Sequence, residues 1–334
     1  MELFNPNSNI DFMRWRKVSL VVSCILMVLS AGIIFVRGLN YGLDFTGGTL
    51  VEVTYERAAD VAEVRSALTA GGFEGALVQT YGGSNDFAIR IGTEAHGPAP
   101  DGEAAVPAAG GSAPVEDDAK AADTIAKSVV AALQAQRSDA RVTRSSFVGP
   151  QIGEELRTDG LIAVIFVIAG ISIYLWIRFE WRFAVSAVAS EMHDTLLTVA
   201  AFALTGREFD LPALAAVLSV VGYSINDKIV VFDRVREIFR SSRKGEPSEI
   251  LNRSINSTMS RTIMTGVTTA LAVGTLYFLG GPALESFGLI MLIGIAIGIL
   301  SSIFFANPVL LLLGVSKQDL MPVTKDDPEL ARRP

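Results

Sequence analysis

Long, uninterrupted runs of apolar residues dominate the hydropathy pattern of this chain. A helix needs about 20 such residues to cross the ~30 Å hydrocarbon core of a bilayer, since each residue adds about 1.5 Å. Six segments are long enough, and the last is long enough to tilt or to bend near Pro308. We therefore predict an α-helical membrane bundle with six spans, at residues 18–36, 161–177, 183–204, 211–231, 263–279 and 287–313.

The segment between the first two spans, residues 37–158, has the pattern of a folded α+β domain. Residues 50–55 alternate apolar and polar side chains, as a half-buried strand does. Asp60 and Glu63 resemble a helix-capping box, and Gly71 is a stop signal for that helix. The βαββαβ order of the whole segment predicts a ferredoxin-like extracytoplasmic domain. Its further strand and helix patterns lie at residues 76–80, 86–91, 118–133 and 140–147.

Residues 94–117 interrupt this domain with Ala, Gly, Pro and acidic residues and almost no large apolar side chains. Such a segment buries too little apolar surface to offset the entropy of ordering. We predict a disordered insertion. A tolerated loop is favoured over a binding segment, because insertions of this kind concentrate at exposed loop tips.

Lys and Arg are distributed unequally between the loops, and short loops rich in these residues stay in the cytoplasm. The tail at 1–17, the loop at 232–262 and the tail at 314–334 are the basic segments, together with the turn after the second span. We therefore predict that both the N- and C-termini are cytoplasmic. The first apolar run is too long for a signal peptide and no A-x-A site follows, so we expect an uncleaved anchor.

Composition supports the membrane interpretation and excludes several classes of function. The 334 residues are 50% apolar and 19% charged, with a net charge of −7, so no basic surface for nucleic acid is expected. The single cysteine, Cys24, rules out an intramolecular disulfide, and with two histidines the chain lacks the ligands of a zinc site. The turn at Gly47 and Gly48 lacks the Lys of a phosphate-binding loop. We expect no enzymatic activity, no metal and no organic cofactor.

Ionisable residues inside the spans are the strongest functional signal, because burying a charge in a bilayer is costly. Asp227 lies in the fourth span, and Arg261 enters the fifth span from the same side at similar depth. An aspartate beside a mobile guanidinium suits proton transport, since its proton affinity changes when the guanidinium moves. A static ion pair that pins two helices together is the alternative. Two interpretations of Lys228 stay open, that it snorkels towards the interface or that it serves the neighbours of Asp227, and it is assigned no function.

Three more ionisable residues, Glu191, His193 and Asp194, lie near the middle of the third span. The imidazole of His193 and the carboxyl of Asp194 form a candidate proton relay. Hydrogen bonding that only fixes helix packing explains them equally well. In the last span, Gly294 and Gly298 form a G-x-x-x-G pattern that predicts close helix contact.

Four motifs in a consistent order make the chain similar to a known family. They lie at residues 41–48 (YGLDFTGG), 147–153 (FVGPQIG), 222–234 (GYSINDKIVVFDR) and 252–262 (NRSINSTMSRT). This pattern resembles the SecF proteins of the SecD/SecF family, whose architecture is similar to that of resistance-nodulation-division (RND) exporters. The resemblance covers nearly the whole chain and marks Asp44, Gly47, Gly48, Gly149, Pro150, Gly222, Asn226, Asp233 and Arg234 as motif residues.

The resemblance implies an accessory subunit of the Sec protein translocase in the bacterial inner membrane. Such a subunit works with SecD, which supplies a second six-helix half, and uses the proton-motive force to promote preprotein export. It also implies contact with the Sec translocon channel, unfolded preproteins and membrane lipid, with protons as the coupling ion. The family's proton-coupling positions fall on Asp227 and Arg261. Lys228, Glu191 and the insertion at 94–117 depart from the family pattern and inherit no role.

Two other functions remain open at this point. A proton-coupled exporter of small molecules or lipids requires a substrate pocket in the outer domain, which here is small and polar. A scaffold that only organises other membrane proteins requires that Asp227 and Arg261 be purely structural. Replacing Asp227 by Asn separates the translocase subunit from the scaffold: the subunit should still assemble but lose proton-driven export, whereas the scaffold should lose neither.

Overall fold

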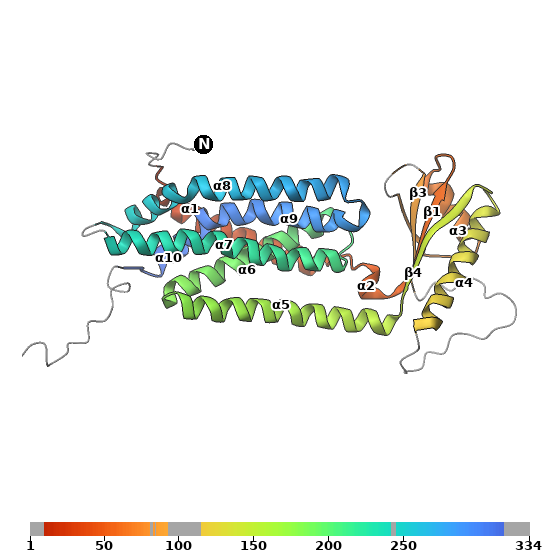
Figure 1. The fold of residues 1–334 in the computed structure, drawn as a ribbon, viewed down its shortest axis with the longest axis horizontal. Coiled ribbons are helices and arrows are strands. Elements are labelled where there is room, and N and C mark those ends of the chain that lie inside the picture. Colours follow the sequence, from red (N-terminus) through yellow and green to blue (C-terminus); the bar gives the residue numbers. More distant parts are fainter. Residues whose placement is uncertain (1–9, 81–82, 84, 93–114, 242–244, 317–334) are drawn as a thin grey trace, which may run out of the picture.

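The computed structural model describes residues 10–80, 83, 85–92, 115–241 and 245–316, and consists of a long helical bundle with a small α+β domain at one end (Figure 1). Residues 94–114 of the predicted insertion, the first nine residues and the tail from 317 lie outside the described residues. We predicted that the insertion extends to residue 117, but helix α4 (Val115–Gln134) already includes residues 115–117.

The bundle is built from long helices that run roughly parallel to its axis (Figure 1). Among the described residues, five helical segments are long and apolar enough to cross a membrane, so the chain is a multi-pass membrane protein. Helix α6 is not among them, because Glu191, His193 and Asp194 lower its hydropathy, yet it packs against α1, α7 and α9. The bundle helices are α1 (Arg16–Arg37), α5 (Pro150–Arg178), α6 (Trp181–Thr205), α7 (Leu211–Ser241), α8 (Pro247–Leu279), α9 (Pro282–Ser301) and α10 (Asn307–Leu312).

Several helices extend beyond the apolar segments that predicted them. Helix α5 begins at Pro150, so residues 150–158, which we had assigned to the outer domain, belong to a helix continuous with the second span. Pro150 favours this start, because proline at the first helical position loses no intrahelical hydrogen bond. Helices α7 and α8 likewise occupy most of the predicted loop at 232–262. These extensions contain charged residues, so a search for long apolar runs did not include them.

The last span is interrupted where a bend was expected. A short π-helix, η2 (Ser302–Ala306), separates α9 from α10 just before Pro308. Proline cannot donate a backbone hydrogen bond, which favours an irregularity at this point. Within the irregular turn, the side-chain amide of Asn307 donates to the Ser302 carbonyl at 2.6 Å. The glycine prediction for this span also holds: a Cβ on Gly294 would collide with Val220 of α7.

The outer domain has the predicted element order: β1 (Gly48–Tyr55), α3 (Val61–Ala70), β2 (Leu77–Thr80), β3 (Asp86–Ile91), α4 and β4 (Ala140–Val148). The four strands pair antiparallel in the spatial order β2-β3-β1-β4. Val51, Val53 and Tyr55 of β1 are buried, as their alternation predicted, and form one core with residues of α3 and α4. Asp60 caps α3 by accepting a hydrogen bond from the Ala62 amide at 2.9 Å.

A four-residue helix that the sequence did not predict, α2 (Leu43–Thr46), joins the domain to the bundle. The Phe45 ring stacks on Phe209, which lies between α6 and α7, at a centroid distance of 6.0 Å. A helix of one turn is too short to show a hydrophobic period, which explains why the pattern missed it.

Replacing Gly47 by Ala is expected to loosen this connection. Gly47 has φ of +69°, and an added Cβ would lie 2.8 Å from the Pro150 Cα, so the substitution combines backbone strain with a backbone clash. Gly75→Ala is the matched control, since its φ is +88° but nothing lies within 4 Å of the added atom. Thermal unfolding in detergent should show a loss of about 1–3 kcal/mol more for Gly47→Ala. Equal losses would mean that the close contact is unimportant.

Candidate functional site

Asp227 lies near the middle of α7 and is only 4% exposed. Its Oδ2 atom is buried and has no hydrogen-bond partner among the described residues. Arg261 lies on α8, is exposed, and attracts the Asp227 carboxylate electrostatically, but the two form no ion pair within 4.0 Å. The structure thus shows an electrostatic attraction between the two predicted residues but no direct ion pair, and the adjacent Lys228 attracts the Asp227 carboxylate more strongly than Arg261 does.

A second group of polar side chains lies deeper in the bundle, and we call it the charged cluster. It consists of Glu191, His193 and Asp194 of α6, Ser224 and Lys228 of α7, and Ser301 of α9. All six are buried, and Lys228 is fully buried at 0% exposure. Close approach of α9 helps to assemble the cluster, because a Cβ on Gly298 would lie 3.0 Å from the Ser224 hydroxyl oxygen.

Lys228 is the centre of the charged cluster, so the expectation that it snorkels to the interface is wrong. Its ammonium donates to Asp194 Oδ2 at 2.7 Å, to the Ser224 hydroxyl at 2.6 Å and to Glu191 Oε2 at 3.2 Å. The physical reason is that a neighbouring helix presents two carboxylates at the same depth, and pairing with them stabilises a buried ammonium. The sequence shows that α6 and α7 each carry charged residues inside an apolar segment, but it does not show that these residues face one another.

His193 and Asp194 contact each other, with 2.8 Å between His193 Nδ1 and Asp194 Oδ1. The His193 ring also stacks on Phe305 of the π-helix η2, at a centroid distance of 4.3 Å. Asp194 Oδ2 accepts further hydrogen bonds from Ser224 and Ser301, both at 2.6 Å. The two residues proposed as a relay are thus embedded in a network that joins α6, α7 and the end of α9.

Five of the family-motif residues meet where the outer domain joins the bundle, a region we call the junction. Asp44 Oδ2 accepts a hydrogen bond at 2.9 Å from the Leu211 amide, the first residue of α7. Gly47 and Gly48 have φ of +69° and +127° and lie against Pro150 and Ile91. Gly149 is the N-cap residue of α5, and Pro150 is its first residue. The motif therefore fixes where two spanning helices begin.

Charged residues also link the domain to the bundle at the junction. Arg90 of β3 forms an ion pair with Glu208 at 3.3 Å and donates to the Tyr41 carbonyl at 3.0 Å. Burial raises the pKa of the nearby Asp210 to about 6, and the charges of Asp44 and Glu208 add to this shift, although a hydrogen bond from the Ala213 amide opposes it.

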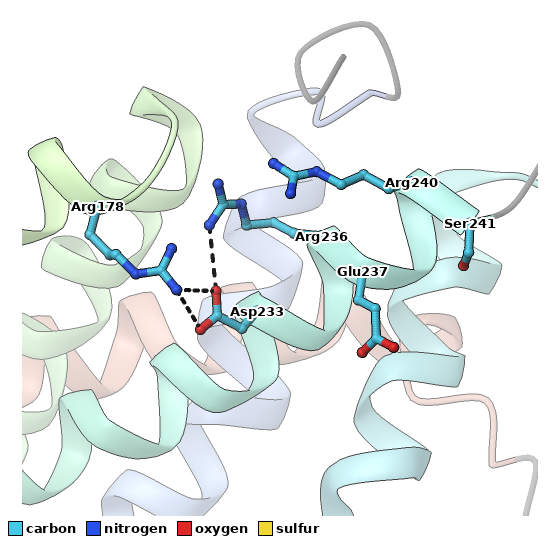
Figure 2. A pocket seen from close by; sticks show the side chains of 6 residues that line it. All are labelled: Arg178, Asp233, Arg236, Glu237, Arg240 and Ser241. Atoms are coloured by element: carbon cyan, nitrogen blue, oxygen red, sulfur yellow. Dashed lines mark hydrogen bonds and ion pairs between the residues drawn. The ribbon is translucent and has the colours of Figure 1, made fainter. Parts of the chain in front are cut away.

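The remaining motif residues lie apart from the junction. Gly222 and Asn226 lie on the exposed face of α7, one turn apart. Asp233 lies at the end of the bundle opposite the outer domain, where it pairs with Arg178 at 3.0 Å and Arg236 at 3.4 Å beside a cavity of about 540 Å³ (Figure 2). Arg234 bonds Ser257 and Glu237 at 3.1 and 2.6 Å. This group ties α5 to α7 through a surface ion pair and α7 to α8 through the hydrogen bond between Arg234 and Ser257.

Comparisons with known proteins agree with this architecture. Residues 128–316 match the family described as "Protein export membrane protein SecD/SecF, C-terminal", and residues 32–59 match "SecD/SecF GG Motif". The chain is similar to the protein translocase subunit SecF of Pseudomonas aeruginosa, with 41% identity over 95% of this chain and 96% of the relative. Its counterpart from Vibrio alginolyticus is 37% identical over 100% and 99%, respectively.

The fold is also similar to that of a solved structure. The crystal structure of SecDF from Thermus thermophilus, a translocon-associated membrane protein, matches with a TM-score of 0.76 and 34% identity. The match covers 93% of this chain but 39% of that longer chain.

The stability of the folded protein should fall as the pH rises through about 6, because Asp210 titrates there. Its pKa is raised in the folded state above the ordinary value of 3.8, so the folded state binds the proton more tightly than the unfolded state. This contribution is present at low pH and is lost between about pH 4 and 6. Thermal unfolding in detergent should lose less stability over this range in Asp210→Asn than in the unmodified protein. Identical pH profiles would show that Asp210 does not titrate in this way.

Proposed function

The chain belongs to the SecF branch of the SecD/SecF family of protein export membrane proteins, and from this premise we propose how it works. It is an accessory subunit of the Sec protein translocase that, with SecD, uses the proton-motive force to promote preprotein export across the bacterial inner membrane. The observation that carries the proton-coupling part is the buried Oδ2 of Asp227, which has no hydrogen-bond partner among the described residues, with the exposed Arg261 of α8 attracting this carboxylate electrostatically.

Asp227 is suited to carry a proton for a physical reason. A carboxylate with a buried oxygen and no hydrogen bond to it is costly to keep ionised in an apolar helix bundle. Approach of Arg261 favours the ionised form, and its withdrawal favours the protonated form. Proton uptake and release at Asp227 would therefore follow the relative position of α7 and α8, which is the requirement for coupling proton flow to motion.

We propose that α6 is the sixth spanning helix, despite its polar residues. The charged cluster neutralises most of its charge inside the bundle, and α6 is enclosed between α1, α7 and α9. We assign the outer domain to the extracytoplasmic side of the membrane. We also assign it a ferredoxin-like fold, which its strand order β2-β3-β1-β4 supports. The basic residues at the opposite end, Arg178, Arg236 and Arg240 among them, support cytoplasmic N- and C-termini.

A SecD-type partner supplies the second half of the membrane assembly in this proposal. The solved SecDF chain contains a much longer sequence, of which this chain spans 39%. The exposed faces of α7 and α8 carry Asn226, next to Gly222, and Arg261. Polar side chains such as those of Asn226 and Arg261 are costly to expose to lipid. A partner subunit that covers these faces removes that cost. The translocon channel, unfolded preproteins and membrane lipid complete the proposed set of contacts.

For His193 and Asp194 we propose a supporting role in place of the relay. Asp194 Oδ2 already accepts hydrogen bonds from Lys228, Ser224 and Ser301, so this carboxylate anchors Lys228. The proposal includes no chemical reaction and no cofactor other than the coupling proton. The named relatives are translocase subunits, which favours preprotein export over the export of small molecules or lipids.

Asp227→Asn should abolish the part of preprotein export that depends on the proton-motive force and leave expression and assembly unchanged. Asparagine keeps the size of the side chain but carries no exchangeable acid proton. Export into inverted membrane vesicles, measured with and without an uncoupler, checks this expectation. Asp123→Asn is a control, because that carboxylate lies exposed on α4, where it pairs with Lys127. Full energised export by Asp227→Asn would refute proton coupling at this residue.

A SecD-type protein should copurify with the tagged chain from gentle detergent, since it covers the polar faces of α7 and α8. Arg261→Gln changes that face and should leave less of the partner bound, whereas Arg65→Gln on the outer domain should not. Mass spectrometry of the purified complexes gives the ratio of partner to chain. Purification of the chain without such a partner would contradict the proposed assembly.

A further inference from the structure

The charged cluster carries two carboxylates and one ammonium, and its hydrogen bonds indicate where each proton resides. The facing groups come from three helices: Glu191, His193 and Asp194 from α6, Ser224 and Lys228 from α7, and Ser301 from α9. Asp227 directly precedes Lys228 in α7, and the Lys228 ammonium attracts its carboxylate. With both carboxylates ionised and His193 neutral, the cluster has a net charge of −1 in a buried, low-dielectric position.

Asp194 is the ionised carboxylate of the pair. Its Oδ2 accepts from the Lys228 ammonium and from the Ser224 and Ser301 hydroxyls at 2.6–2.7 Å, and its Oδ1 lies 2.8 Å from His193 Nδ1. Four donors converging on one carboxyl group stabilise the anion and leave no room for a proton. The negative charge of Asp194 therefore balances the positive charge of Lys228.

His193 is neutral by the same reasoning. Its Nδ1 carries the hydrogen that is donated to the ionised Asp194. Its Nε2 is buried and has no hydrogen-bond partner among the described residues. A second proton on Nε2 would create a buried cation with an unsatisfied donor, which is costly. The cluster thus has no further positive charge to offset Glu191.

Glu191 is the carboxyl group of the charged cluster whose negative charge no positive charge balances. Its Oε2 accepts one long hydrogen bond, 3.2 Å from the Lys228 ammonium, and its buried Oε1 has no hydrogen-bond partner among the described residues. An ionised Glu191 would leave a net negative charge and an unsatisfied anionic oxygen in the bundle. A protonated Glu191 leaves the whole cluster neutral.

We infer that Glu191 carries a proton in this conformation and is a second proton-binding site of the bundle, distinct from Asp227. The proton is exchanged with water, which leaves Glu191 as a carboxylate. That extra negative charge then competes for Lys228, which also attracts the Asp227 carboxylate. Because such coupling is reciprocal, the protonation of one carboxyl changes the proton affinity of the other. The exchange role rests on the proposed proton-coupled function, whereas the protonation itself does not.

Infrared difference spectroscopy of the purified chain in lipid vesicles tests the protonation directly. At pH 7 the unmodified protein should show a carboxylic-acid C=O stretching band that Glu191→Gln removes. Glu191→Asp should keep such a band at a shifted frequency, which separates loss of the acid from loss of the fold. Glu154→Gln, an exposed carboxyl on α5, should leave the band unchanged. A spectrum of Glu191→Gln identical to that of the unmodified protein would overturn the assignment.

Energised export in inverted vesicles tests whether the proton is exchanged. Glu191→Gln should lose the uncoupler-sensitive part of export, and Glu191→Asp should restore part of it. Export that is unchanged in Glu191→Gln, although the infrared band is lost, would overturn the exchange role. If Asp227→Asn also exports normally, the proposed function fails, but the infrared result still decides whether Glu191 is protonated.

Discussion

The pairing of Lys228 with Asp194 inside the bundle is the interaction on which the membrane region depends. A fully buried ammonium is tolerated only because a carboxylate on the neighbouring helix lies 2.7 Å away and two hydroxyl groups complete the arrangement. Removing one partner from such a pair typically costs about 3–5 kcal/mol, because the other charge stays buried. This network of ion pairs and hydrogen bonds fixes how α6, α7 and α9 are positioned relative to one another. It also explains how α6 can bury three ionisable residues inside the helical bundle.

Helix α7 connects this constraint to the rest of the molecule. It begins at the junction, where Asp44 bonds its first amide, and it carries Asp227 and Lys228 near its middle. At its far end Asp233 pairs with α5 through Arg178 (Figure 2). A continuous helix transmits a displacement along its length with little bending. In the proposed function, a movement that follows proton binding at Asp227 would therefore be transmitted to the point where the outer domain is attached.

Much of this organisation could be predicted from the sequence, because three of its signals are local. Alternation identified β1, capping identified α3 at Asp60, and the G-x-x-x-G pattern identified the contact of Gly294 with Val220. Contacts between distant segments could not be predicted. Nothing local indicates that Lys228 faces Glu191, since that depends on how two helices rotate against each other. Helix α2 and the extension of α5 to Pro150 were missed because neither has a long apolar run.

The central claim is that proton movement through this chain accompanies preprotein export, and proton flux measures it most directly. The chain and a SecD-type partner would be reconstituted with the translocon in vesicles that contain a pH-sensitive dye, and flux would be recorded while a preprotein is exported under an imposed gradient. The account predicts proton flux that starts with export and is absent when position 227 cannot ionise. Equal flux with and without an ionisable group at that position would contradict it.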